Sequence, residues 1–194
     1  MSEGAADPRS FFTEKMPQDW NRALVEQERA VDATIRVEVR GEGGGIFFLN
    51  IAEGRMAAGD LPAHPPFMTL VQDRGSFERL AAEAGDSAMG MLGGLSGLAG
   101  GMKLTRGRLD NLDAVKGTLL FEVTGSQGFR VLTHFGPGTP PEEPDTTLSV
   151  DPAAYRDLRT GLLDPQTAFM SGKIKVVGNM QLAMQLALAA LSPD

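Results

Sequence analysis

The sequence predicts an α+β protein in which helices cover a mainly antiparallel β-sheet. Residues 34–40 and 46–51 alternate between apolar and polar side chains, which is typical of two half-buried strands joined as a hairpin. Residues 118–124 and 129–135 repeat this pattern and predict a second hairpin. In each half, a further strand and a helix-forming segment follow the hairpin. This recurrence predicts two tandem copies of one arrangement, related to each other as a pseudo-dimer.

Composition limits the classes of function. The chain has 194 residues, of which 42% are hydrophobic, so it can form one large domain or two domains of about 100 residues each. Its net charge is −7 and it contains no basic run, which argues against nucleic acid as a partner. The absence of cysteine excludes a disulfide framework, a thiol nucleophile and a thiolate metal site.

The N-terminal residues and the hydropathy of the chain bear on its location. Residues 1–12 contain an early acidic residue and no apolar segment of the signal-peptide type. No uninterrupted apolar stretch reaches the roughly 18 residues that a membrane-spanning helix needs. We therefore expect a cytoplasmic protein.

We expect three regions along the chain. They are a loose tail over residues 1–18, a first copy over residues 19–117 and a second copy over residues 118–194. Pro8 and Pro17 are the reason for expecting a loose tail.

Caps and turn residues predict the other elements of the first copy. Asp19 is the expected N-cap of a helix over residues 20–33, and Ser76 is the expected N-cap of a helix over residues 77–84. Five other elements complete this copy. They are a glycine turn (residues 41–45), a proline-containing loop (61–66), a third strand (67–72), a late strand (102–109) and a short helix (111–116).

The second copy continues after its hairpin and ends in an apolar helix. Asp151 is the expected N-cap of a helix that has Pro152 in its first position. The other expected elements are an acidic proline-rich loop (residues 137–144), a strand (146–150), a helical turn (165–170), a last strand (172–177) and the closing helix (179–191).

Residue identities at two fixed offsets relate the copies. Residues 69–70, 77 and 80 match residues 147–148, 155 and 158 in residue type or character at an offset of 78. Residues 112–114 match residues 182–184 at an offset of 70. The Gly- and Met-rich residues 85–101 would then be an insertion in the first copy. A single continuous α+β domain whose halves look alike by chance is the alternative.

Residues 85–101 have two interpretations. The segment carries no charge after Asp86 and is too short to span a bilayer. It can be a flexible loop, or a mobile apolar flap that touches a membrane; we favour the flap.

An extended motif occupies residues 145–191. Residues 164–184 read DPQTAFMSGKIKVVGNMQLAM, preceded by TLSVD at residues 147–151 and YRDL at residues 155–158. This pattern resembles the signature of the sterol carrier protein-2 family, also called nonspecific lipid-transfer proteins. The first half resembles a degenerate copy, in which residues 102–104 match part of the signature and the DPQTAF run is missing.

The resemblance implies a fold and a function. It implies a five-stranded sheet with helices on one face and an apolar tunnel between the sheet and the helices. It implies that the tunnel accepts a fatty acid, an acyl-CoA, a phospholipid or a sterol, and that the C-terminal helix closes it. No catalytic step and no cofactor are implied.

The closing helix is apolar nearly all round. Over residues 180–191, Gln181 and Gln185 are the only polar side chains, and their spacing of four places them on one narrow stripe. Leaving even ~200 Å² of apolar surface exposed would forgo roughly 5 kcal/mol. We therefore expect the sheet to cover one side of this helix, and a ligand, a partner or the other half of the chain to cover another.

The candidate lipid-binding residues are apolar side chains of the second copy and one glutamine. Met170, Met180 and Met184 are expected to line a cavity because methionine adapts to irregular guests, with ordinary core filling as the alternative. Gln166 either contacts the ligand, as the resemblance implies, or bonds the nearby backbone. The complete set is Phe121, Val123, Phe129, Val131, Phe135, Leu148, Tyr155, Leu158, Leu162, Gln166, Phe169, Met170, Met180, Met184 and Leu188.

Two lysines interrupt this apolar region. Lys173 and Lys175 alternate with Ile174 and Val176, so their side chains are expected to point to solvent. There they could meet anionic head groups or phosphates.

The sequence predicts no enzymatic activity and no metal site. His64 lies next to prolines in a loop, His134 lies on a strand, and neither is at metal-ligand spacing from another histidine. No Gly-x-Ser-x-Gly elbow is present, and the glycines of residues 41–45 lead into a strand, whereas a phosphate loop leads into a helix.

We therefore expect non-catalytic binding or intracellular carriage of a lipid in an apolar tunnel. The alternative is a structural, oligomerisation or regulatory module that uses the same apolar surfaces for protein contacts. Transient membrane contact and homo-oligomerisation stay open.

Overall fold

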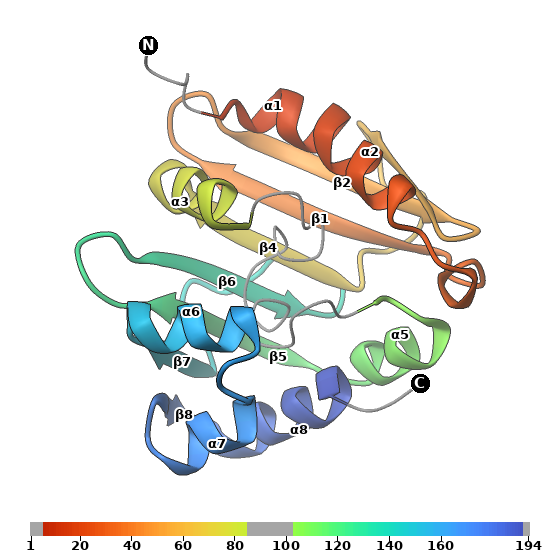
Figure 1. The fold of residues 1–194 in the computed structure, drawn as a ribbon. Helices are drawn as coiled ribbons and strands as arrows, with labels where there is room; N and C mark the ends of the chain where they lie inside the picture. The colour runs from red at the N-terminus through yellow and green to blue at the C-terminus, as the bar shows by residue number, and fades with distance from the viewer. Residues whose placement is uncertain (1–5, 85–102, 192–194) are drawn as a thin grey trace.

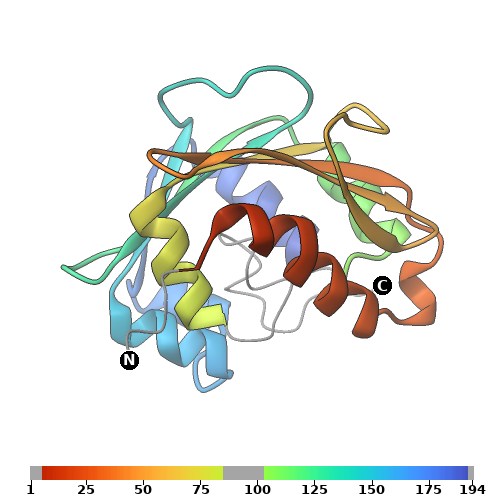
Figure 2. The same cartoon turned by 90° about the horizontal axis from the view of Figure 1, so that it is seen from above.

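One eight-stranded β-sheet organises the part of the chain that the structure describes, residues 6–84 and 103–191 of a computed structural model. The strand order is β3-β2-β1-β4-β6-β5-β7-β8. Figure 1 shows the strands side by side, and Figure 2 shows the helices gathered on one face of the curved sheet. The α+β class and the mainly antiparallel sheet covered by helices are thus confirmed.

The first four strands come from residues 33–73. β1 (Ala33–Arg40) pairs antiparallel with β2 (Gly45–Ala52), and β2 pairs antiparallel with β3 (Arg55–Gly59). β4 (Met68–Asp73) lies parallel to β1 on its other side. This half of the sheet therefore combines a hairpin with a parallel strand.

The last four strands come from residues 117–178. β5 (Gly117–Val123) pairs antiparallel with β6 (Phe129–Phe135) and parallel with β7 (Thr146–Val150). The edge strand β8 (Ile174–Gly178) pairs antiparallel with β7. β4 pairs antiparallel with β6, and this ladder joins the two halves into one sheet.

The two halves have the same local strand order. β2-β1-β4 in the first half corresponds to β6-β5-β7 in the second, and a helix follows β4 and β7 alike. The resemblance implied a five-stranded sheet, whereas each half contributes four strands to a shared sheet of eight. The tandem copies over residues 19–117 and 118–194, and their relation as a pseudo-dimer, stay a prediction.

Alternation along the strands separates a helix-covered face from an open face. Along β1, Ile35, Val37 and Val39 are buried, whereas Arg36 and Glu38 on the other face are partly exposed. The covered face continues from Val37 on β1 to Leu70 on β4 and, across the junction, from Leu70 to Thr133 on β6. A single apolar core therefore underlies both halves.

The N-terminal residues form a helical stretch, so the loose tail expected over residues 1–18 is wrong from Pro8 onward. Asp7 caps α1 (Pro8–Ser10), which continues through the π-helical η1 (Phe11–Lys15) into α2 (Met16–Arg22). Both prolines lie in a first helical turn, where a missing N–H is tolerated.

Packing is the reason for this helical stretch. Phe11, Phe12, Met16 and Trp20 are all buried, and the Phe12 ring centroid lies 5.2 Å from that of Phe47. The spacing of these apolar residues outweighs the prolines. The helix expected over residues 20–33 is correspondingly wrong beyond Arg22, where the chain turns through the short η2 (Glu26–Glu28) towards β1.

Three other expectations for the first half differ from the structure. Strand β3 was not predicted, because its Ala- and Gly-rich sequence has low strand propensity. Its position depends on Asn21, whose side chain accepts a hydrogen bond from the Met56 N–H and donates one to the Met56 carbonyl. The late strand over residues 102–109 is wrong within the described residues: Thr105 caps α5 (Arg106–Asp113), which also replaces the helix expected over residues 111–116. The late strand of the first half would have needed a free edge of β4, but β6 of the second half pairs with that edge.

The helix after β4 begins earlier than expected. α3 (Arg74–Ala84) is capped by Asp73, whose carboxylate accepts a hydrogen bond from the Ser76 backbone N–H at 2.7 Å, so Ser76 is not the cap. Residues 85–101, for which a loop or flap was expected, lie outside the described residues.

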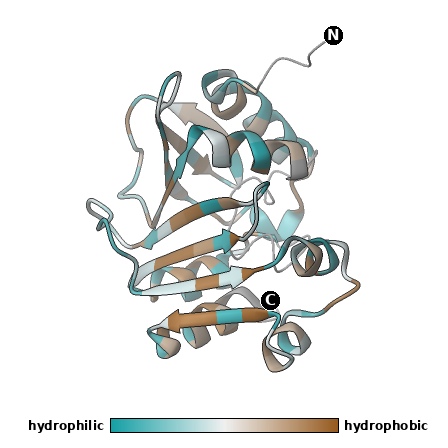
Figure 3. Ribbon diagram, turned by 90° about the vertical axis from the view of Figure 1, so that its left-hand side faces the viewer, coloured by the Kyte–Doolittle hydropathy of each residue, from teal (hydrophilic) through white to brown (hydrophobic). Residues whose placement is uncertain are grey.

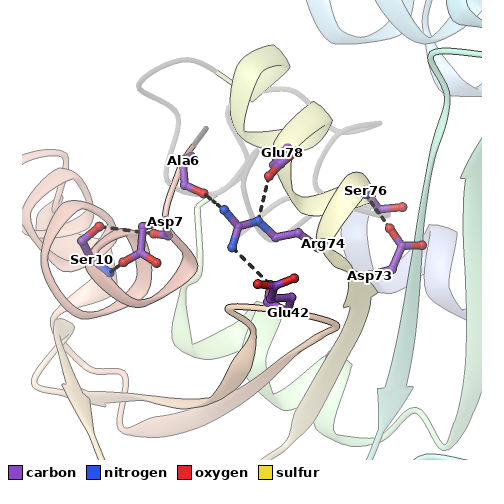
Figure 4. A network of polar contacts seen from close by, with 8 residues as sticks. All are labelled: Ala6, Asp7, Ser10, Glu42, Asp73, Arg74, Ser76 and Glu78. Carbon is purple, nitrogen blue, oxygen red and sulfur yellow. Dashed lines mark hydrogen bonds and ion pairs between the residues drawn. The ribbon is translucent and has the colours of Figure 1, made fainter. Parts of the chain in front are cut away.

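A polar network around Arg74 fastens the N-terminal helix to the sheet (Figure 4). The Arg74 guanidinium donates to the Glu78 carboxylate at 2.7 Å, to the Ala6 carbonyl at 3.1 Å and to the Glu42 carbonyl at 3.5 Å. In the same view, Asp7 accepts from the Ser10 N–H at 2.9 Å, and this hydrogen bond is the main reason that the pKa of Asp7 is lowered. The network connects the start of α1, the β1–β2 turn and α3.

The C-terminal helices match their predicted positions closely. α6 (Pro152–Thr160) is capped by Asp151, which accepts from the Ala154 N–H at 2.8 Å, as the sequence predicts. α7 (Pro165–Met170) precedes β8, and α8 (Met180–Leu191) follows it. Both α7 and α8 pack against β8, so they lie at the same edge of the sheet (Figure 1).

Candidate functional site

The candidate lipid-binding residues fall into a buried group and an exposed group. The buried group lies on the covered face of the sheet and on α6, with at most 6% of each residue exposed: Phe121, Val123, Phe129, Val131, Phe135, Leu148, Tyr155 and Leu158. The exposed group lies on α7, on α8 and before α7: Leu162, Gln166, Phe169, Met170, Met180, Met184 and Leu188.

The buried group forms part of the protein core. The Tyr155 ring centroid lies 5.3 Å from that of Phe129 and 6.1 Å from that of Phe121. Contacts at these distances are ordinary aromatic packing. As the structure places them, these side chains hold α6 on the sheet.

Helix α8 has two apolar sides, of which only one is covered. Leu182, Ala183, Leu186 and Ala189 are buried where α8 packs against α5, β7 and β8. Met180, Met184 and Leu188 follow one another at intervals of four residues and are 44%, 59% and 69% exposed. We call these three residues the α8 stripe. The sheet covers one side of the helix as expected, and the α8 stripe is open.

Local hydrogen bonds fix the start of α8. Asn179 accepts from the Leu182 N–H at 3.1 Å through its side chain and donates its own backbone N–H to the Asp145 carbonyl at 2.9 Å. The stripe thus begins at a helix terminus that is attached to the sheet.

Helix α7 adds exposed apolar side chains. Phe169 is 44% exposed and Met170 is 77% exposed, while Leu162, just before α7, is 82% exposed. Asp164 caps the helix, and hydrogen bonds from the Thr167 hydroxyl and backbone N–H lower the pKa of its carboxyl. The Gln166 side chain is exposed beside this cap.

A glutamine lies within the core of the described residues. Gln72 faces the helices from β4 at the junction of the two halves and is only 4% exposed. Its side-chain oxygen has no hydrogen-bond partner among the described residues. The sequence contains a signal for this residue, because Gln72 is a polar residue at an inward-facing position of the strand predicted over residues 67–72.

The described part of the chain contains no cluster of three or more His, Asp or Glu side chains that could hold a metal ion. His134 lies on the open face of the sheet, with its Nδ1 atom 2.9 Å from the Thr118 hydroxyl. Among the described helices, none combines the length and apolarity that crossing a bilayer requires.

A pocket of about 310 Å³ lies on the N-terminal helical stretch, away from the predicted residues. Charged, polar and apolar side chains line it: Ala6, Asp7, Ser10, Phe11, Glu14, Lys15 and Gln18. It contains none of the candidate lipid-binding residues.

The sequence model of one family matches the part of the chain that forms α5, β5–β8 and α6–α8. This family is described as the SCP-2 sterol transfer family, and the match covers residues 102–190. Residues 102–190 belong to the SCP-2 sterol transfer family. The match starts before residue 118, where the second copy was expected to begin, and includes the helix α5. The α8 stripe lies within this SCP-2 region.

Relatives of the SCP-2 region are parts of much longer proteins. Hydroxysteroid dehydrogenase-like protein 2 of Pongo abelii is 36% identical over 84 residues, which cover 40% of this chain and 20% of that protein. Sterol carrier protein 2 of Rattus norvegicus is 44% identical over 50 residues, which cover 26% of this chain and 9% of that protein. The chain thus spans a fifth or less of these two relatives.

A solved structure also matches part of the chain. It is the sterol carrier protein domain 2 of Helicoverpa armigera, which is 34% identical and has a TM-score of 0.32. The match covers 44% of this chain and 77% of that one.

Proposed function

We propose that the protein binds and carries a lipid without catalysing a reaction, and that the ligand lies along the α8 stripe. A fatty acid, an acyl-CoA, a phospholipid and a sterol are the ligand classes that fit. The observation that carries this proposal is the exposure of Met180, Met184 and Leu188 on a helix whose other side is packed, within an SCP-2 region. We further propose that the carrier acts in the cytoplasm.

Burial of apolar surface would drive binding. Each methylene of an acyl chain removed from water contributes ~0.8 kcal/mol. Two of the three stripe residues are methionines, whose unbranched side chains adapt to guests of different shape. A stripe of this composition favours a range of apolar ligands over one specific ligand.

A second candidate is a module that uses the same surface for protein contacts. The observation that favours it is the relative named as a hydroxysteroid dehydrogenase-like protein, in which the matched segment is 20% of a longer chain. In that case the α8 stripe would pack against another domain or subunit, and the region would serve an enzyme rather than carry a lipid.

Two substitutions on adjacent residues test the carrier proposal. Met184→Glu places a carboxylate on the stripe, whereas Gln185→Glu places the same carboxylate at an exposed residue beside it. In titrations with a fluorescent fatty acid, Met184→Glu should weaken binding about tenfold or more. The reason is that a buried carboxylate costs more than the ~1.4 kcal/mol equivalent to tenfold in affinity. Gln185→Glu should bind within about twofold of the wild type, and both variants should melt like it.

The carrier proposal fails if the wild type binds no fatty acid, or if both variants lose binding equally. Native mass spectrometry of the purified protein separates the two candidate functions. Co-purified lipid supports the carrier, and a lipid-free dimer that Met184→Glu dissociates supports the module.

A further inference from the structure

Exposed large apolar side chains are concentrated at one edge of the molecule. Nine such residues occur in the described part of the chain, and seven of them lie between residues 162 and 188. The seven are Leu162, Phe169, Met170, Val177, Met180, Met184 and Leu188. The α8 stripe accounts for three of them, and the other four lie around α7 and on the edge strand β8.

The charge of this edge is opposite to that of the whole chain. Lys173 and Lys175 are the only charged residues between Pro165 and Leu191, in a chain with a net charge of −7. Both lysines are exposed, as the sequence predicts, and neither has an ion-pair partner in the described part of the chain.

The backbone brings the lysines close to the exposed side chains of α7. The Lys173 N–H donates to the Ala168 carbonyl at 2.8 Å, and the Gly172 N–H donates to the Phe169 carbonyl at 3.1 Å. Lys173 therefore follows directly on the turn that ends α7, next to Phe169 and Met170. Lys175 and Val177 are two residues apart on β8 and share its open side.

Strand β8 is an edge strand, so no further strand of the described chain covers it. Figure 3 shows this strand as largely hydrophobic. In the sequence of β8, Lys175 is the charged residue. We call Leu162, Phe169, Met170, Lys173, Lys175 and Val177 the basic apolar edge.

We propose that the basic apolar edge docks the protein on the surface of a membrane that contains anionic phospholipids. The surface of such a membrane presents phosphate groups above the apolar acyl chains. Lysine ammonium groups can contact the phosphates while neighbouring apolar side chains enter the interface. Residues 165–191 contain lysines and no acidic residue, whereas the whole chain has a net charge of −7, so an anionic membrane would attract this edge of an otherwise acidic protein and orient it.

Charge also argues against a second copy of this chain as the occupant. Two copies meeting through this edge would bring four lysines together, and residues 165–191 contain no acidic residue to pair with them. Like charges brought together in this way are unfavourable.

Docking through this edge would serve the proposed lipid carriage. The α8 stripe begins two residues after β8 ends, so a ligand on the stripe would be close to the docked edge. This consequence rests on the proposed function, whereas docking itself does not.

Vesicle flotation tests the docking. The variant is Lys173→Glu/Lys175→Glu, and the matched control is Arg9→Glu/Arg55→Glu, which reverses two exposed cations of the first half. The wild type and the control should float with vesicles of phosphatidylcholine and phosphatidylserine, and much less with phosphatidylcholine alone. The affinity of the lysine variant for the mixed vesicles should be lower than that of the wild type by about tenfold or more. Met170→Ser, at a residue that is 77% exposed, should also weaken flotation without changing the melting temperature.

Three results would overturn the docking. They are a wild type that does not float, a control that loses flotation as much as the lysine variant does, and a wild-type dimer that the lysine substitutions dissociate. Fatty-acid titration without vesicles separates this test from that of the carrier function. The lysine variant should bind the fatty acid like the wild type, and a loss there would assign the lysines to the ligand and contradict the docking.

Discussion

Residues 33–84 and residues 117–160 build the same arrangement of a hairpin, a parallel strand and a helix, but the helices beside them leave different surfaces. Beside the first half, the helical stretch from Pro8 to Arg22 buries three aromatic rings and a methionine in the core. Beside the second half, α8 buries one apolar side and leaves the α8 stripe open. One framework can thus be closed by aromatic packing in one place and left available for a guest in another.

The largest expected effect comes from truncating an aromatic ring of the closed half. Phe12 is 1% exposed and contacts the rings of Phe11, Phe47 and Phe77. Phe12→Ala should lower the free energy of unfolding by about 3–5 kcal/mol, because it leaves a cavity that the core cannot fill.

The matched substitution on the open half is Met184→Ala, which should change the free energy of unfolding by less than about 0.5 kcal/mol. Urea unfolding followed by circular dichroism measures both changes. Equal losses for the two variants would mean that the α8 stripe is part of the core, and would remove the contrast between the halves.

Glu28 tests the connection between η2 and the segment that leads into α5. This residue is 3% exposed, and its carboxylate accepts from the Val25 N–H and from the Leu104 N–H, both at 3.1 Å. Glu28→Ala leaves the buried Leu104 N–H and the partly buried Val25 N–H without this partner and should cost about 2 kcal/mol of stability. Glu28→Gln keeps one acceptor oxygen and should cost less. If the two variants are equally stable, these hydrogen bonds do not hold residue 104 against η2.

Gln72 tests the covered face at the junction. Because its side-chain oxygen has no partner among the described residues, Gln72→Leu should leave stability unchanged or raise it by about 1 kcal/mol. Gln72→Glu, which buries a charge, should lower stability by more than about 2 kcal/mol. A Gln72→Leu variant that is clearly less stable than the wild type would show that a group on the covered face bonds this amide.

A smaller loss of stability, which depends on pH, is expected on the open face of the first half. Although burial raises the pKa of Glu38, hydrogen bonds from Arg40 at 2.8 Å and Arg36 at 3.0 Å lower it below its ordinary value of 4.5. The stabilisation is therefore present above pH 4.5 and is lost as the pH falls through the pKa of the folded state.

Glu38→Gln should be about 0.5–1 kcal/mol less stable than the wild type at pH 7, and the difference should shrink towards pH 3. Thermal melts at several pH values measure this difference. A difference that is the same at both pH values would contradict the assignment to the carboxylate.

The second half could be predicted well from the sequence because its signals are local. Alternation marks β5 and β6, Asp151 and Pro152 mark the start of α6, and the motif of residues 164–184 places α7, β8 and the start of α8. The exposure of Lys173 and Lys175 follows from the same alternation.

The first half depends on contacts between residues far apart in the sequence. The helical stretch that includes Phe12 is stabilised by rings from β2 and α3, and β3 is fixed by hydrogen bonds from Asn21. These contacts were not visible in local patterns: prolines pointed to a loose tail, and no element was predicted for residues 55–59. Within the candidate site, composition identified apolar residues, but only burial separates the core residue Phe121 from the exposed Met184.

Photo-crosslinking with a diazirine-labelled fatty acid, mapped by mass spectrometry, tests whether a ligand lies along the α8 stripe. Adducts should concentrate on Met180, Met184 and Leu188, and an excess of unlabelled fatty acid should suppress them. Adducts confined to the helical stretch of the first half, or labelling that unlabelled fatty acid does not reduce, would contradict this prediction.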